Sequence, residues 1–256
     1  MLERLMHRDP HKPRGLLAGL LESYPAYVAP FPGDPAKITE EQARANLDAL
    51  LAQKQARLAL IRAVLARFDI DFDAGLAAIE PDSFFKQIDR WAVATWPDIG
   101  GNDGQERLQH ELRWLVRQRL RSAFPAVADQ ELISLKRWRS SDRAGADIFY
   151  SLLLDLSLAL GEVAMRRRPE IYWGLDLTIR AEDDRAEYHV PVLRGVRVPD
   201  SKDDPSCEEA YALEPALFLS FADICTTVTP DMCEPTRYLR GMISDYAALR
   251  RHATRS

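Results

Sequence analysis

Four polar residues of the chain have types and a spacing that can do chemistry: Asp147, Ser151, Asp155 and Glu162. Successive offsets of four and seven put them in one narrow stripe along an α-helix. Paired carboxylates on one helix face can serve as acid and base or can bind a divalent metal. No histidine lies in this stretch, and no nucleophile-and-base pair accompanies it. A buried helix with one hydrogen-bonded edge therefore explains the stripe equally well. We expect no catalytic residue, metal or cofactor, and keep as the alternative a metal-dependent enzyme that uses Asp155 and Glu162.

Two charged groups are candidates for binding a partner. The first is a basic ridge at helical spacing, formed by Arg113, Arg117 and Arg121. The second is an acidic loop that contains Asp200, Asp203 and Asp204. Either group can contact a surface of opposite charge, although a solvated helix face is a sufficient explanation for the arginines.

A glycine-rich loop covers residues 98–104 and invites comparison with ligand-binding loops. A phosphate-binding P-loop needs a lysine followed by Ser or Thr after its last glycine, but Gln105 and Glu106 stand there. Gly100 and Gln109 occupy two positions where a calcium-binding EF-hand has its ligands. The loop is therefore interpreted as a connector.

The stripe lies on a predicted helix that is apolar almost all round, from Ala144 to Arg166, which places the helix in the middle of a core. Behind it, apolar residues alternate from Ile171 to Ile179, as in a strand covered on one face. This phase puts Trp173 on the buried face, against the helix, and also buries Leu177. A polar turn leads to a second strand over residues 187–193, in which Pro191 predicts an edge strand or a bulge.

The first 37 residues contain four prolines between positions 25 and 35, and are expected to be a peripheral arm and linker. Thr39 and Gln42 then form a capping-box pattern that predicts a helix from about Glu40 to Phe68. Its apolar residues recur at helical spacing, whereas Arg57 and two further arginines are assigned to the rest of its surface. Further helices are predicted over residues 81–95, 105–122, 129–138, 215–225 and 236–251. Residues 38–256 are expected to form a single α+β domain, mainly helical, with the central buried helix packed on a small antiparallel sheet.

Composition limits the class of protein. Of 256 residues, 46% are hydrophobic and 29% are charged, as in a soluble globular protein, and the net charge of −5 argues against nucleic-acid binding. Three cysteines without close pairs favour reduced thiols in a cytosol. The longest apolar run, Ile148–Leu160, is shorter than the roughly 20 residues that span a bilayer. We expect a cytoplasmic protein that does not bind membranes.

Two segments resemble one group of bacterial proteins. Residues 83–91 are similar to an S-L-x-x-L-D-x-W element, and residues 158–163 with Trp173 are similar to an L-G-E-V…W element of the same group. Ala159 stands where that group usually has an aromatic residue. The group consists of uncharacterised α+β proteins, some of which look like immunity proteins of polymorphic or secreted toxin systems. The resemblance implies an α+β fold in which Gly161 lets the helix approach the sheet and Glu162 bonds a nearby amide or arginine.

The expected function is a cytoplasmic protein-binding module, an immunity protein that neutralises a cognate bacterial toxin. It follows from the acidic balance, from the lack of a catalytic set in the sequence, and from this resemblance. The partner would be a protein, possessing a basic surface that the acidic loop faces.

Overall fold

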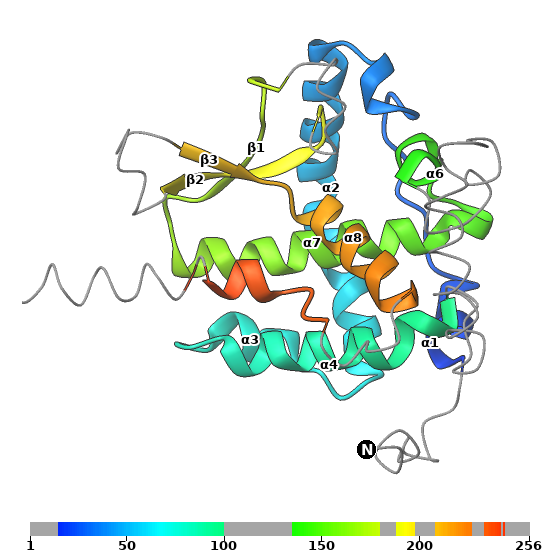
Figure 1. The fold of residues 1–256 in the computed structure, drawn as a ribbon, viewed down its shortest axis with the longest axis vertical. Helices are drawn as coiled ribbons and strands as arrows, with labels where there is room; N and C mark the ends of the chain where they lie inside the picture. The colour runs from blue at the N-terminus through cyan, green and yellow to red at the C-terminus, as the bar shows by residue number, and fades with distance from the viewer. Residues whose placement is uncertain are drawn as a thin grey trace, which may run out of the picture.

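The computed structural model of the chain describes residues 15–99, 135–179, 188–197, 208–226, 233–241 and 243. They form an α+β fold in which a small antiparallel sheet lies beside a larger helical body, as predicted (Figure 1). The longer helices are α2 (Glu40–Ala66), α4 (Asp82–Ile99), α7 (Ile148–Arg167) and α8 (Leu213–Thr226). The shorter ones are α1 (Leu16–Leu21), α3 (Phe72–Ala77) and α6 (Leu135–Ser140), with single 3₁₀ turns at Pro35–Lys37 and Gly145–Asp147.

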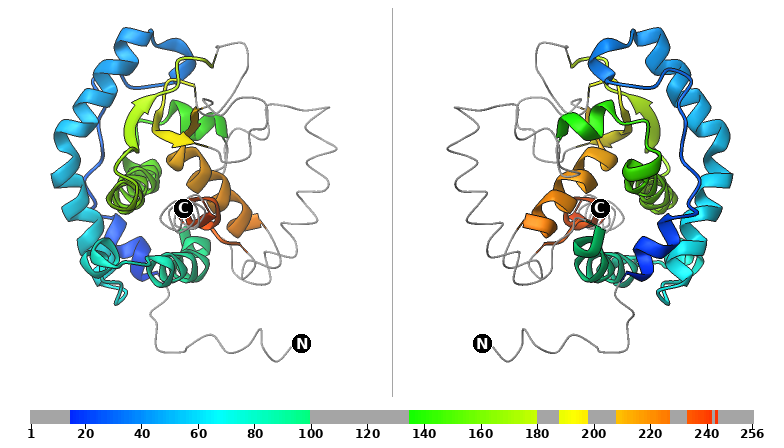
Figure 2. Two further views of the ribbon diagram at one scale, coloured as in Figure 1. Left: turned by 90° about the vertical axis from the view of Figure 1, so that its left-hand side faces the viewer. Right: turned by 90° about the vertical axis from the view of Figure 1, so that its right-hand side faces the viewer.

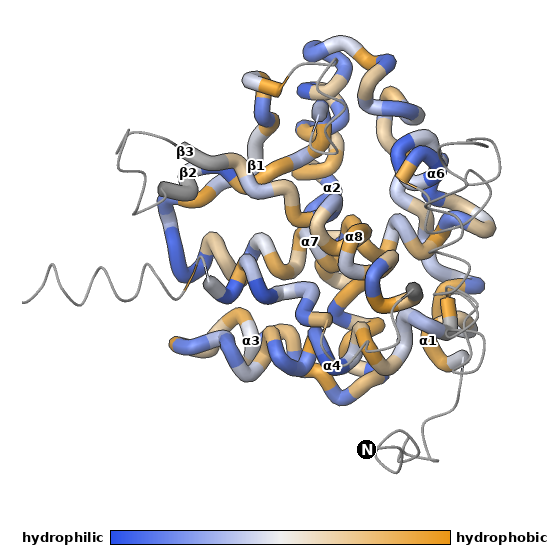
Figure 3. Tube along the Cα trace, viewed as in Figure 1, coloured by the Kyte–Doolittle hydropathy of each residue, from blue (hydrophilic) through white to orange (hydrophobic). Residues whose placement is uncertain are grey.

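Helix α7 runs through the middle of the molecule. It packs against α2 on one side and α8 on the other, and lies between the sheet and the α3–α4 pair (Figures 1 and 2). Side chains from Phe149 to Leu160 are all buried, which follows from an apolar composition around nearly the whole helix. Figure 3 shows the same concentration of hydrophobic residues along α7 and α8. The segment Gly145–Arg167 is long and apolar enough to cross a bilayer, but 83% of its most apolar window is buried inside the protein, as in a core helix.

Helix α2 confirms its sequence signals. The Thr39 hydroxyl accepts from the Gln42 amide at 3.3 Å, and the Gln42 side chain accepts from the Thr39 amide at 2.9 Å. This reciprocal pair satisfies two amides that the first helical turn leaves without partners, so the helix begins at Glu40. Its buried face includes Leu50, Leu58 and Ile61.

The sheet has the order β1 (Tyr172–Leu175), β2 (Pro191–Arg197), β3 (Glu208–Tyr211), and both pairings are antiparallel. The predicted first strand is too long at its end. It stops at Leu175 because the Asp176 carboxylate accepts from the Thr178 amide and hydroxyl, which makes a turn. Leu177 is therefore 38% exposed instead of buried.

Strand β2 differs from its prediction in the residue at which it begins and in its place within the sheet. It begins at Pro191, the first residue of a strand, where a missing N–H costs no ladder bond. Residues 188–190 form a turn instead, in which His189 has a left-handed φ of 55°. The strand is central, not an edge, because β3 pairs with its other side, and β3 itself had not been predicted.

The bulge predicted at Pro191 is not there, because Pro191 pairs in register with Leu175; β2 is irregular at Gly195 instead. The register with β3 shifts between Leu193 and Val196. Gly195 has a φ of 81°, and a Cβ there would lie 2.2 Å from the Glu170 carbonyl oxygen. Only glycine fits this bend, which brings the strand against the turn that follows α7.

The N-terminal segment is not peripheral over the residues that can be described. Leu17, Leu21, Tyr24 and Tyr27 are buried and belong to the same apolar core as the rest of the chain. Pro25 lies after α1, between the two buried tyrosines. Burial of the Tyr24 and Tyr27 side chains removes apolar area from water and so holds this segment against the helical body. The domain boundary at residue 37 stays a prediction.

Helix α4 also extends beyond its predicted end. It was predicted to end at residue 95, just before Pro97, but the helix continues to Ile99 with Pro97 inside it. Trp96 is fully buried, with ring centroids 5.8 Å from Phe149 and 6.1 Å from Phe221. This aromatic packing offsets the hydrogen bond that proline removes from the last turn.

Asp89 of α4 holds the segment after α8. Its carboxylate accepts from the Thr236 amide at 2.8 Å and from the Thr236 hydroxyl at 2.9 Å. Burial raises the pKa of Asp89, and these two bonds act in the opposite direction. Within the second predicted C-terminal helix, residues 237–241 are helical. Helix α8 confirms the first.

The contact between α7 and the sheet is made by Gly161 and Trp173. Trp173 is 9% exposed, and a Cβ at Gly161 would lie 2.3 Å from its ring. A glycine is required here for close approach and not for an unusual backbone angle, because the residue lies inside α7.

Gly161→Ala should therefore destabilise the protein by about 1–3 kcal/mol, since the added methyl group overpacks a buried ring. The measurement is the free energy of unfolding from urea denaturation. Gly19→Ala is the matched control, because Gly19 lies in α1 with open space around its Cβ position. That change should be neutral or stabilising by up to about 1 kcal/mol. Equal effects of the two substitutions would contradict the Gly161–Trp173 contact.

Candidate functional site: a buried charge network beside an apolar groove

Within the polar stripe, Asp155 of α7 meets Arg57 of α2. The Arg57 guanidinium donates from Nε to Oδ1 and from Nη2 to Oδ2 of Asp155, both at 2.7 Å. Both side chains are almost fully buried, at 5% and 0% exposure. The pair is bidentate, the geometry in which arginine binds a carboxylate most strongly.

Tyr24 joins this pair from the N-terminal segment. Its hydroxyl donates to Oδ2 of Asp155, and the remaining Nη1 of Arg57 donates to the Pro25 carbonyl at 2.9 Å. Burial raises the pKa of the Tyr24 hydroxyl, with the Asp155 charge adding to the effect, so the hydroxyl stays a donor. Burial also raises the pKa of Asp155 to about 6, against the bonds from Arg57 and Tyr24, which lower it. Three segments far apart in sequence thus meet at one carboxylate.

A second set of bonds continues the network toward α8. The Ser151 hydroxyl accepts from the Tyr27 amide at 2.8 Å and donates to the Arg143 carbonyl at 2.9 Å. The Arg143 guanidinium bonds the Glu214 carboxylate at the start of α8, and Trp138 donates to the same carboxylate at 3.0 Å. The network therefore links the N-terminal segment, α2, α6, α7 and α8.

The other two carboxylates of the stripe have cations of their own. Glu162 pairs with Lys54 of α2 at 2.8 Å, and Asp147 pairs with Arg137 of α6 at 2.6 Å. Glu162 thus bonds a lysine, not the amide or arginine that the resemblance implied. The stripe is real as geometry, but each acid meets a different base, so it does not bring its carboxylates together around one ion. Across the described ranges, no group of three or more His, Cys, Asp or Glu residues has the arrangement of a metal site.

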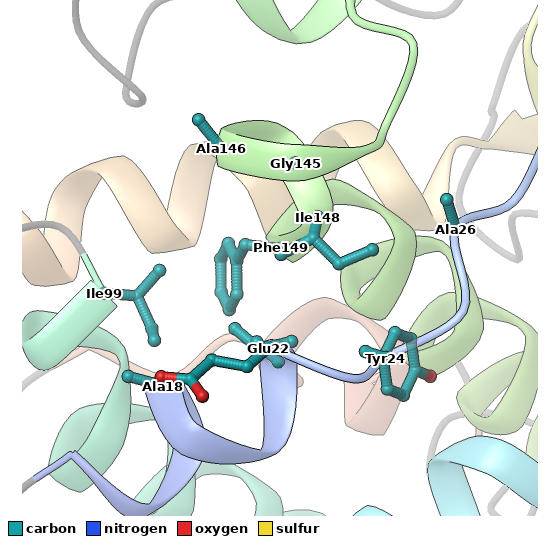
Figure 4. A pocket seen from close by; sticks show the side chains of 10 residues that line it. Ala18, Glu22, Tyr24, Ala26, Ile99, Gly145, Ala146, Ile148 and Phe149 are labelled. Atoms are coloured by element: carbon teal, nitrogen blue, oxygen red, sulfur yellow. The ribbon is translucent and has the colours of Figure 1, made fainter.

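An open groove lies next to this network. It has a volume of about 400 Å³ between the end of α1, the end of α4 and the start of α7. Figure 4 shows Ile99 of α4, Phe149 of α7 and Glu22 beside α1 converging on this space, with Tyr24 beside them. The ring of Tyr24 lines the groove while its hydroxyl bonds Asp155, so the groove and the network share one side chain.

Both predicted partner-binding groups lie outside the described residues. These are the basic ridge of Arg113, Arg117 and Arg121 and the acidic loop of Asp200, Asp203 and Asp204. Gly161 and Trp173 keep their predicted structural role.

Arg57, Tyr24, Arg143 and Glu214 were not recognised from the sequence. A signal for Arg57 existed, because it belongs to a series of residues spaced seven apart along α2: Ala43, Leu50, Arg57 and Val64. The other three members of this series are buried and apolar. An arginine in such a series is placed on the buried face of its helix and needs a buried acid. Lys54 likewise belongs to a series spaced seven residues apart whose other members are apolar: Leu47, Ile61 and Phe68.

Comparison of the chain with known protein families, with curated proteins and with solved structures gives no match. The resemblance to immunity-like proteins therefore rests on the short elements in residues 83–91 and 158–173 alone.

Arg57→Met should destabilise the protein by about 3–5 kcal/mol, because it leaves the Asp155 carboxylate buried without its cation. Adding Asp155→Asn to this variant should restore part of the loss, since no acid then remains to be buried. Urea denaturation measures both values. The matched control is Arg62→Met: Arg62 and Asp73 form a pair that is 48% and 62% exposed, and such pairs contribute at most about 1 kcal/mol. An Arg57→Met effect as small as that of the control would show that the buried pair does not stabilise the fold.

Asp155 should also leave a signature in the pH dependence of stability. With a folded pKa of about 6 and an ordinary value of 3.8, the folded protein holds a proton between these pH values that the unfolded chain has lost. The free energy of unfolding contributed by this group should therefore rise as pH falls from about 7 to 4, by about 3 kcal/mol. The measurement is the difference in stability between wild type and Asp155→Asn at each pH. If that difference instead falls toward pH 4, Arg57 and Tyr24 outweigh burial and the pKa of Asp155 is low.

Proposed function

We propose that this chain is a cytoplasmic protein-binding module, and more specifically an immunity protein that neutralises a cognate bacterial toxin. The observation that carries the proposal is the pairing of the acidic stripe. Asp147, Asp155 and Glu162 are each neutralised by a base from another element. These ion pairs tie helices together and so hold the surface between them in a fixed shape. A rigid surface suits a protein that acts by binding.

The alternative, a metal-dependent enzyme that uses Asp155 and Glu162, has less support. Arg57 and Lys54 would have to leave these carboxylates before a divalent cation could bind, and Asp155 has no exposed surface from which to take one. The donor set does not fit such an ion, which prefers several oxygen ligands around one site.

A cytoplasmic location is part of the proposal. The Cys225 thiol is buried in the core and donates to the Trp96 carbonyl at 3.6 Å. Buried thiols that are not in disulfide bonds are usual in a reducing compartment.

The proposal is tested with the product of the gene directly upstream. Expressed alone in a bacterial host, that product should arrest growth, and co-expression of this chain should restore growth. The two purified proteins should co-elute as a stoichiometric complex in size-exclusion chromatography. Glu80→Lys is a suitable control for nonspecific charge effects, because Glu80 is exposed and lies just before the start of α4, whereas the groove lies at the end of α4. An upstream product that is harmless, or that is toxic but neither bound nor neutralised, would overturn the assignment.

A further inference from the structure

We propose that the groove between α1, α4 and the start of α7 is the partner-binding surface, and that it takes a short segment of the partner in which an apolar side chain stands next to a lysine or arginine. This inference rests on the proposed function, because it names the surface and the kind of segment through which the chain would bind. It draws on the shape, lining and charge of the groove.

The groove is an open, partly apolar hollow. Its volume of about 400 Å³ is enough for a side chain of a partner segment. Ile99 and Ile148, which come from two different helices, are partly exposed and supply its apolar walls, while Phe149 lines it but is almost fully buried. An apolar side chain that enters between them loses contact with water on several sides, which is the main source of binding energy at such anchors.

The carboxylate of Glu22 at the groove determines which residue of the partner can stand next to that apolar side chain. Glu22 directly follows α1, is exposed, and makes no hydrogen bond or ion pair among the described residues. Figure 4 shows its carboxylate near Ala18, beside the apolar walls. None of the described residues that line the groove is a Lys, Arg or His. A cation next to the apolar anchor would meet a free carboxylate, and an acid in that place would be repelled.

The position of the other carboxylates strengthens this assignment. Asp147, the residue after the groove-lining Ala146, is already paired with Arg137, so it does not compete with Glu22 for a cation from outside. The net charge of −5 likewise favours a basic partner over a second copy of this chain.

One wall of the site is fixed before the partner arrives. Tyr24, which forms this wall, is held by its hydroxyl bond to Asp155, and Tyr27 is held by the bond from its amide to Ser151. These bonds anchor the segment after α1 to α7, so this wall keeps its position without a ligand. Preorganisation of this kind lowers the entropic cost of binding.

Alanine methyl NMR of the full chain tests the proposal with two dipeptide probes, N-acetyl-Leu-Arg-amide and N-acetyl-Leu-Glu-amide. The arginine probe at millimolar concentration should shift the methyl signals of Ala18, Ala26 and Ala146, which line the groove. The methyl signal of Ala63, on the outer side of α2, should stay in place. The glutamate probe should produce no comparable shifts. Equal shifts with both probes, or shifts spread away from the groove, would overturn the proposal.

Two variants separate the charge from the cavity. Glu22→Lys should weaken binding of the arginine probe by roughly fivefold, whereas the same change at Glu80 should leave it unchanged. Ala146→Trp should abolish binding by filling the groove. Both positions are exposed, so both variants should keep the wild-type urea midpoint. Unchanged probe binding in Glu22→Lys and Ala146→Trp would overturn the site.

The upstream gene product distinguishes this site from the function on which it rests. If that product binds wild type and loses affinity for Glu22→Lys and Ala146→Trp, both proposals stand. If it binds the variants as well as wild type, the function stands and the groove is not its surface. If the arginine probe fills the groove but the upstream product neither binds nor is neutralised, the groove stands and the immunity function fails. Self-association of the chain that Ala146→Trp abolishes would assign the groove to a second copy and overturn the proposed occupant.

Discussion

The structure depends on how one buried carboxylate is satisfied. Helix α7 is apolar almost all round and buried over most of its length, and the Asp155 side chain has no access to water. An isolated charge there would be very unfavourable, and Arg57 with Tyr24 supplies the partners that make it tolerable. This requirement fixes how α2 lies along α7 and ties residues 24–27 across both helices. Replacing Arg57 and Asp155 with well-packed apolar residues can leave stability unchanged. It would still remove the constraint that positions these three segments relative to one another.

The parts of the fold that were predictable are those in which the local pattern has a single physical explanation. Thr39 and Gln42 fix the start of α2, and the apolar circumference of α7 places that helix in the core. The burial of Trp173 against α7 followed from strand phase, and Gly161 was expected to let the helix approach the sheet; the direct contact between these two residues was not predicted. Each of these signals is complete within a short stretch of sequence.

The errors arose where tertiary packing outweighed a local rule. Pro97 lies within α4 because Trp96 is locked among aromatic rings. Leu177 is exposed because Asp176 forms a turn that ends the strand. The stripe on α7 was found, and a hydrogen-bonded edge was one of its two explanations, but its partners were not, because the bases that neutralise it come from α2 and α6. Arg57 was assigned to the polar surface of α2, although every seventh residue around it, Ala43, Leu50 and Val64, is apolar and buried. That series shows that position in a pattern can outweigh residue type.

The central ion pair also sets a time order on the making of the protein. Arg57 and Asp155 are 98 residues apart, and Tyr24 and Asp155 are 131 apart. At a synthesis rate of roughly 5–20 residues per second, α2 is complete for roughly 5–20 seconds before its acid is made. During that interval the apolar face of α2 has no α7 to cover it, and Tyr24 has no acceptor. A nascent chain of this protein therefore carries an uncovered amphipathic helix until its second half emerges, and the N-terminal segment is among the last parts to find its place.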